Sequence, residues 1–162
     1  MKVKVMGDRV HVEPVRVRKS GSIDLGDKGS GVFWRVRAVG SGVYADSIVE
    51  GDIVVLREGI GDAMGLSDGS MLMGAHGIWC ALRGDRVCAV GPRVAIEADA
   101  DPEEAATLAG IILLRHDRDF PTLGYADGER VAFNNKSHQL RLGWAGKLWV
   151  VGDRADTLVG WV

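Results

Sequence analysis

The sequence predicts an all-β protein built from two tandem copies of one small domain, and a repeated phrase and the glycine content both favour this fold. The phrase G-x-R-V-x-(V/I)-E occurs twice, at residues 7–13 and 91–97. Each copy is a glycine turn followed by alternating apolar and polar residues, the pattern of a half-buried strand. The 23 glycines have no collagen period and are typical of short strands joined by tight turns. We therefore predict a first domain over residues 1–90 and a second over residues 91–162.

Composition and charge argue against several classes of protein. Half of a 162-residue chain is close to the size at which a single core is marginal, so oligomerisation is expected. A content of 46% hydrophobic and 26% charged residues is that of a globular protein. A net charge of −2 argues against a nucleic-acid partner. No apolar run reaches the roughly 20 residues that span a bilayer, and residues 1–4 lack a signal-peptide core, so we expect a cytoplasmic or virion protein.

The first half should contain a polar loop between strongly patterned strands. The expected strands are residues 3–13 with a break at Gly7-Asp8, 32–39, 53–56, and a hairpin of 78–82 with 87–90. The loop over residues 14–30 has too few apolar residues to bury a core of its own. A two-residue turn in the hairpin sets Cys80 opposite Ala89 and Cys88 opposite Ala81. The two cysteines are therefore not direct partners, and we predict that they are reduced.

Two interpretations stay open for the glycine-rich stretch over residues 57–77: hairpin connections, which its pattern favours, and an adaptable apolar contact surface. Its glycine spacing fits neither a dinucleotide fingerprint nor a phosphate loop. Flexible methionine side chains suit a contact surface. The candidate residues for this secondary contact surface are Met64, Leu66, Met71 and Met73.

The second half is predicted to repeat these elements, with a short helical turn in place of the loop. Asp101 suits an N-cap, Pro102 the first helical position, and Gly110 the stop. The expected strands are residues 111–114, matching 34–39; 127–133, matching 50–56; 140–144; and the pair 147–151 and 157–162, repeating the closing hairpin. A strand at residues 157–162 is expected to pair with another subunit.

Five pieces of the first half follow one another in a recognisable order. They are Asp8-Arg9-Val10, the loop segment Ser22-Ile23-Asp24-Leu25, the strand end Arg37-Ala38-Val39-Gly40-Ser41-Gly42, Val49-Glu50-Gly51-Asp52-Ile53-Val54, and residues 78–90. This order resembles the GroES-like co-chaperonin (chaperonin-10) family. The similarity covers residues 1–90 well and 91–162 more faintly, so the second copy is divergent.

The resemblance implies a small, partly open β-barrel in each half, oligomers that pair the first and last strands of neighbours, and no catalysis. It also implies a mobile loop whose apolar tripeptide docks on a chaperonin ring, here at the partner-binding residues Ser22, Ile23, Asp24 and Leu25. Desolvating an unpaired carboxylate costs several kcal/mol. This cost offsets the gain from two aliphatic side chains at ~2 kcal/mol each. Docking therefore requires Asp24 to face water or a cation.

Catalytic and metal-binding patterns have little support in the sequence. His11 with Glu13, and His76 with Cys80, stand at spacings that a metal site uses, but neither pair has a third ligand close by in the chain. No histidine is placed beside a nucleophile in a recognisable pattern. We predict no enzyme activity, no metal and no cofactor.

Two functions of different class fit these observations. The first is a non-enzymatic, oligomeric structural module that stabilises a large assembly, such as a phage capsid decoration protein. The second is a co-chaperonin that caps a chaperonin ring through residues 20–27. The expected partners are other copies of the chain, through terminal strands, and either a capsid lattice or a chaperonin ring, with neither nucleic acid nor membrane.

Overall fold

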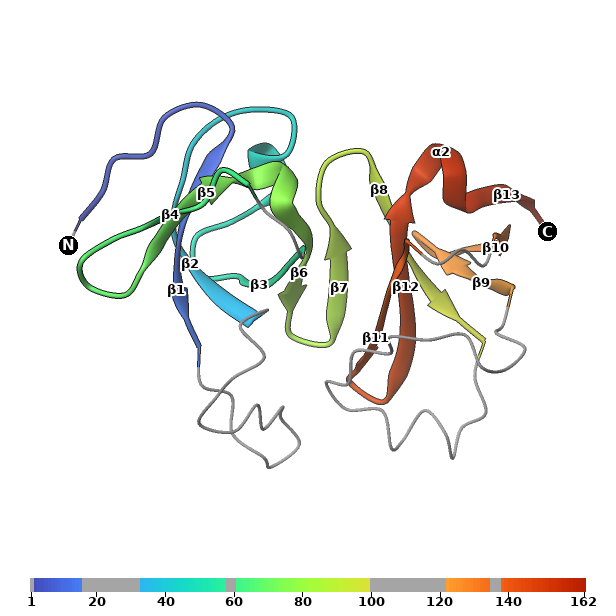
Figure 1. The fold of residues 1–162 in the computed structure, drawn as a ribbon. Coiled ribbons are helices and arrows are strands. Elements are labelled where there is room, and N and C mark those ends of the chain that lie inside the picture. Colours follow the sequence, from blue (N-terminus) through green and yellow to red (C-terminus); the bar gives the residue numbers. More distant parts are fainter. Residues whose placement is uncertain (1, 16–32, 58–60, 100–121, 135–137) are drawn as a thin grey trace.

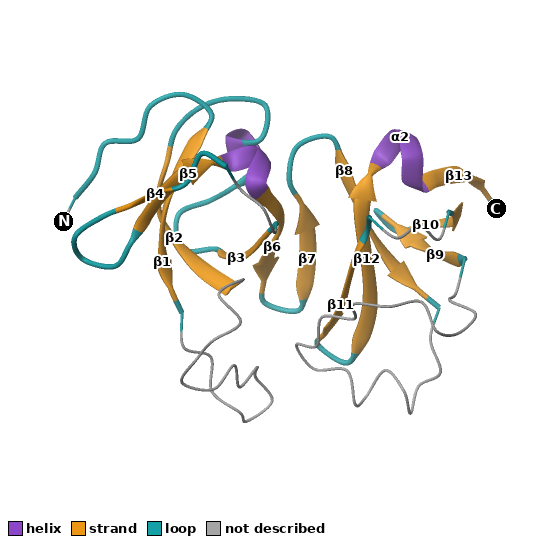
Figure 2. Cartoon of the chain, viewed as in Figure 1, coloured by secondary structure: helices purple, strands orange, loops and turns teal. Residues whose placement is uncertain are grey.

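The computed structural model describes residues 2–15, 33–57, 61–99, 122–134 and 138–162, and it confirms the all-β prediction. These residues form two antiparallel sheets joined by a short connection, as Figures 1 and 2 show. The centre of the predicted loop, the helical turn after Asp101 and the strand at 111–114 all lie outside the described residues.

The first sheet has seven strands in the order β4-β5-β1-β2-β3-β6-β7. Their bounds are β1 Arg9–Pro14, β2 Phe33–Val39, β3 Ile53–Leu56, β4 Met64–Gly65, β5 Met71–Gly74, β6 Ile78–Arg83 and β7 Arg86–Ala89, with 3-10 helices η1 Ala45–Ser47 and η2 Ala75–Gly77. The hairpin of β6 and β7 has the predicted register, with Cys80 opposite Ala89 and Cys88 opposite Ala81, and both cysteines are free. Residues 3–6, predicted as part of the first strand, form no strand within the described chain.

The second sheet has six strands in the order β11-β12-β8-β9-β10-β13. Their bounds are β8 Arg93–Ala98, β9 Leu123–Ala126, β10 Glu129–Phe133, β11 Leu140–Trp144, β12 Lys147–Asp153 and β13 Leu158–Trp161, with the helical turn α2 Arg154–Thr157 between the last two. This order is that of β4-β5-β1-β2-β3-β6, strand for strand. The two halves therefore share one topology, and β7 is the additional strand of the first sheet.

The equivalence of the two repeats extends to single residues. The glycines that open the repeated phrase, Gly7 and Gly91, have φ of 65° and 66°. The register shifts between Val55 and Leu56 in β3, and at the equivalent step of β10. The residue that follows each of these strands donates its backbone N–H to the carbonyl oxygen of an equivalent turn residue. Arg57 donates to Gly77, just before β6, at 2.7 Å, and Asn134 donates to Thr157, just before β13, at 2.8 Å.

The predicted closing hairpin of the second half is wrong. Residues 147–151 lie in β12, which pairs with β8 and β11, whereas β13 pairs with β10 on the other side of the sheet. The turn α2 carries the chain from one strand to the other, as η2 does between β5 and β6. The strand that matches β2 is β9, and not residues 111–114.

Each repeat buries a core of its own, and a third cluster lies between them. Val10, Val12 and Val54 belong to the core of the first repeat, and Val94, Ile96 and Val131 occupy the equivalent places in the second. The third cluster joins Phe33, Val55, Cys80, Leu82 and Val87 of the first repeat to Leu140, Leu142 and Val151 of the second. Among the described strands neither sheet is hydrogen-bonded into a closed ring, since β4 and β7 end one order and β11 and β13 the other.

Candidate assembly interface

The junction between the repeats is a packed interface rather than a linker. Its apolar part is the third cluster, in which each fully buried aliphatic side chain contributes roughly 2 kcal/mol. At the edge of this cluster, Trp144 donates from Nε1 to the Gly84 carbonyl oxygen at 2.8 Å. The two repeats therefore form one unit.

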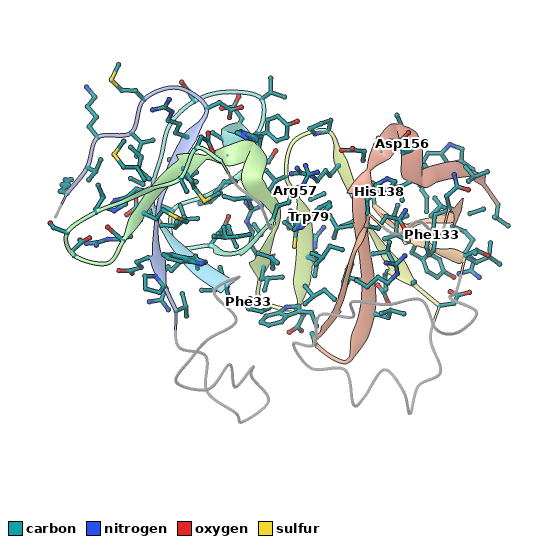
Figure 3. The ribbon with its side chains drawn as sticks, in the orientation of Figure 1. Phe33, Arg57, Trp79, Phe133, His138 and Asp156 are labelled. Atoms are coloured by element: carbon teal, nitrogen blue, oxygen red, sulfur yellow. The ribbon has the colours of Figure 1, made fainter. Side chains whose placement is uncertain are left out.

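Arg93 is the main polar side chain of this junction. It is only 7% exposed, and its guanidinium donates to the carbonyl oxygens of His76, at 2.8 Å, and of Ile78. It also lies over the rings of Trp79 and Tyr44, at 5.1 and 5.5 Å from their centroids. Burial lowers the pKa of this guanidinium, and the two carbonyls and two rings offset part of the cost of desolvation. Figure 3 labels Trp79 and its other cationic neighbour, Arg57, next to each other at β6 of the first sheet.

β7 belongs to the second repeat by its position, although it completes the first sheet. Counting back from the shared glycines, residues 86–90 stand before Gly91 as residues 2–6 stand before Gly7. Both segments place apolar residues at alternate positions, Val87 and Ala89 in one, Val3 and Val5 in the other. This shared alternation is visible in the sequence. The prediction of a strand over residues 3–13 joined the N-terminal segment to the strand after it, so the segment was not treated as an element of its own. The first strand of the second repeat therefore covers the edge of the last strand of the first repeat.

Within the described part of the chain, the same two elements at the outer ends of the molecule have no such cover. Among the described strands β13 has β10 as its one neighbour, and Val159 and Trp161 are 63% and 59% exposed. In the other segment Met6 is 79% exposed, while its counterpart Val90 is fully buried. The N-terminal segment and β13 lie at opposite ends of the molecule, so they cannot pair within one chain (Figure 1).

The candidate contact surface is corrected in part by the structure. Met73 is fully buried in the first core and offers no exposed surface, and Met71 is half-buried and packs against that core. Met64 is exposed and Leu66 is half-buried. By strand register these two are the counterparts of Leu140 and Leu142, which lie in the cluster between the repeats. The loop residues Ser22, Ile23, Asp24 and Leu25 lie outside the described residues.

His11 is buried and begins a hydrogen-bond chain that reaches the surface, which the sequence did not predict. Its Nε2 lies 2.7 Å from Ser70 Oγ, and Ser70 donates to Asp68, which pairs with Arg37 at 3.3 Å. Burial lowers the pKa of His11, and the hydrogen bonds from Ser70 lower the pKa of Asp68. The single hydroxyl hydrogen of Ser70 goes to Asp68, so His11 donates from Nε2–H to Ser70 Oγ. The imidazole is then not a base toward the serine, and the carboxylate does not orient it, so this is not the geometry of a nucleophilic triad.

The other titratable groups do not assemble into a metal site within the described part of the chain. His76 has Asp62 at 4.0 Å, and no third ligand stands with them among the described residues. No group of three histidine, cysteine or acidic side chains in the described ranges is placed to hold a metal ion. Burial raises the pKa of the Cys80 thiol well above its usual range, which is the environment of an unreactive cysteine.

Comparison with known proteins names no family: no protein-family model matches the chain, and no curated protein matches it significantly. In the described part of the chain, every helix is too short or too polar to cross a membrane. A function for this protein therefore has to be argued from the geometry of its two repeats.

Proposed function

We propose that this protein is a non-enzymatic structural module that self-associates head to tail and stabilises a large assembly, for example as a decoration protein of a phage capsid. The observation that carries the proposal is the pairing of β7 with β6. The chain uses this pairing to join its own two repeats, and it presents the counterparts of both strands, residues 2–6 and β13, at its two ends. The N-terminal segment of one copy then pairs with β13 of the next.

The internal junction fixes the register of the pairing between copies. Cys80 lies opposite Ala89 and Ala81 opposite Cys88. Gly160 and Trp161 are the counterparts of Cys80 and Ala81, and Val5 and Lys4 are those of Ala89 and Cys88. Between copies, Gly160 therefore lies opposite Val5 of the next copy, and Trp161 opposite its Lys4. The apolar side chains that are exposed in one copy, Val159, Trp161 and Met6, become covered in the pair.

The second contact of the proposed interface is a packing of sheet faces. In the internal junction Phe33 and Val55 of the first repeat pack in one cluster with Leu140 and Leu142 of the second. The counterpart of Phe33 is Leu123, which is 38% exposed, and the counterpart of Leu140 is the exposed Met64. Between copies Leu123 therefore faces Met64, which would account for both exposed apolar residues.

A proline scan of residues 2–6 tests the strand pairing. In antiparallel pairing, alternate residues hydrogen-bond to the partner, and Val90 N–H donates to the Trp79 carbonyl oxygen at 3.3 Å. Lys4, the counterpart of Cys88, therefore directs its N–H toward the neighbour, while Val5 directs it away. Lys4→Pro removes a donor from the ladder and should weaken self-association far more than Val5→Pro, measured by sedimentation equilibrium. Equal effects of both variants, or a monomer at all concentrations, would contradict the proposal.

A disulfide trap tests the register independently. Val5 and Gly160 form a non-hydrogen-bonded pair in the proposed ladder, where Cβ atoms approach within reach of a disulfide. A Cβ at Gly160 meets no atom within 4 Å, so Gly160→Cys is tolerated. Mild oxidation of Val5→Cys/Gly160→Cys should give covalent oligomers. The off-register pair Val3→Cys/Gly160→Cys is the matched control and should give few.

The role in a larger assembly is tested on particles. The protein should be found in stoichiometric amounts on purified particles from its source, and Lys4→Pro should lower its occupancy there. Absence from every purified particle would remove this role and leave self-association alone.

A second candidate, a co-chaperonin, is favoured by the order of the strand pieces that resemble the GroES-like family. A closed ring of such chains always contains an even number of repeats, because each chain contributes two. Mixing the protein with a chaperonin ring and nucleotide tests this candidate. Saturable capping that is lost on Ile23→Ser or Leu25→Ser would favour the co-chaperonin over the structural module.

A further inference from the structure

Arg9 and Arg93 are the arginines of the repeated phrase, and they have different surroundings. Arg93 is buried in the junction between the repeats, where it holds the carbonyl oxygens of His76 and Ile78. Arg9 stands at the equivalent place after Gly7 and is exposed. If copies associate as the internal repeats do, the acceptor for Arg9 lies on the next molecule.

The positions of the acceptors follow from strand register. Leu56 pairs with Ile78 and Phe133 with Leu158, each beside the same register shift, so Leu158 is the counterpart of Ile78. Counting back two residues, Asp156 is the counterpart of His76. Asp156 is exposed on α2, at the end of the molecule opposite the N-terminal segment (Figure 3).

We infer that Arg9 of one copy binds the α2 end of the neighbouring copy, at the carbonyl oxygens of Asp156 and Leu158 and at the Asp156 carboxylate. The Asp156 carbonyl accepts from Asn134 Nδ2 at 3.1 Å, and its second lone pair suits a guanidinium. This inference rests on the proposed head-to-tail self-association and names a residue pair that determines its specificity.

The contact between copies differs in chemistry from the internal one. Trp79, which stacks on Arg93, has Val159 as its counterpart. Tyr44 lies in a long β2–β3 connection that the short β9–β10 turn at Asp127 and Gly128 does not reproduce. The carboxylate of Asp156 replaces the aromatic stacking, so recognition between copies is ionic, and salt should weaken it.

Charge reversal tests the pair in the full chain. Arg9→Glu and Asp156→Arg should each weaken self-association about tenfold at low salt, as expected for loss of a close charge pair, and the double variant should recover most of the affinity. The charge-matched controls Arg86→Glu and Asp85→Arg, at exposed positions where the β6–β7 turn meets β7, should change it little. Sedimentation equilibrium at two salt concentrations measures the five variants and the unmodified protein, and circular dichroism confirms that each is folded.

The outcomes separate this inference from the proposed self-association. If the Val5→Cys/Gly160→Cys trap forms but neither single reversal weakens association, or the double variant does not recover it, the role of Arg9 is wrong and head-to-tail association stands. If neither the trap nor any association is observed, both fail. Weakening by both singles with recovery in the double supports the pair.

Discussion

Trp144 Nε1 donates to the carbonyl oxygen of Gly84 at 2.8 Å, and this bond joins the second repeat to the β6–β7 turn of the first. Trp149, on the neighbouring strand and packed on the same cluster, buries its Nε1 with no hydrogen-bond partner among the described residues. The two indoles pack on one surface and differ in hydrogen bonding.

This difference gives a matched test of the junction. Trp144→Phe removes a made hydrogen bond and should lower the free energy of unfolding by about 1 kcal/mol beyond the lost ring area. Trp149→Phe removes a buried donor that has no partner, so its cost should be smaller or its effect stabilising. Urea unfolding of both variants measures the difference. A larger cost for Trp149→Phe would contradict the assigned hydrogen bonding.

The ion pair of Asp52 and Arg83 predicts an asymmetry between the repeats. Asp52 is buried and accepts from Arg83 Nε at 2.9 Å, from Arg83 Nη2 at 2.8 Å and from the Val49 N–H at 2.8 Å. Asp52→Asn replaces charge-assisted bonds by neutral ones and should cost about 1–3 kcal/mol. The equivalent position of the second repeat holds the exposed Glu129, so Glu129→Gln should cost almost nothing. Thermal unfolding of both variants provides the measurement.

His11 predicts a pH dependence of stability. Burial holds the pKa of His11 below its ordinary value of 6.5, with Arg37 acting in the same direction and Asp68 and Glu13 opposing. The unfolded chain therefore binds the proton more tightly than the folded one, and stability falls as the pH drops below about 6.5. Each unit of pKa difference is worth about 1.4 kcal/mol. His11→Gln should flatten this part of the curve, and His138→Gln, at an exposed histidine, should leave it unchanged.

Much of the fold follows from the sequence because local patterns suffice for it. The alternating strands, the hairpin register of Cys80 and Cys88, and the duplication of the opening phrase depend on residues close together in the chain. The pairing partners of β12 and β13 do not. Residues 147–151 and 157–162 have the pattern of a hairpin, and only the short turn α2 and the packing of Val150 on Ile96 send them to different sides of one sheet.

The candidate interface was less accessible to sequence reasoning, for a physical reason. The shared alternation of residues 2–6 and 86–90 marks them as equivalent segments. Which edge such a strand covers is a tertiary property and does not follow from that pattern. In the candidate methionine surface, alternation across β5 places Met73 in the core, while Met64, on the edge strand, remains exposed. His11 gave no signal, since its partner Ser70 is distant in the sequence.

The two glycines of the repeated phrase provide the last test. Gly7 and Gly91 share a φ near +65°, which costs a residue with a Cβ atom about 1–2 kcal/mol. A Cβ at Gly7 meets nothing within 4 Å, whereas one at Gly91 would overlap the Tyr44 ring that stacks on Arg93. Gly7→Ala should therefore lower the free energy of unfolding only by the backbone cost. Gly91→Ala should lower it more, because it also displaces the Tyr44 ring that packs on Arg93. Denaturant unfolding at protein concentrations too low for self-association compares the two variants. Equal losses of stability would show that the Tyr44 ring moves aside at no cost and does not stabilise the junction.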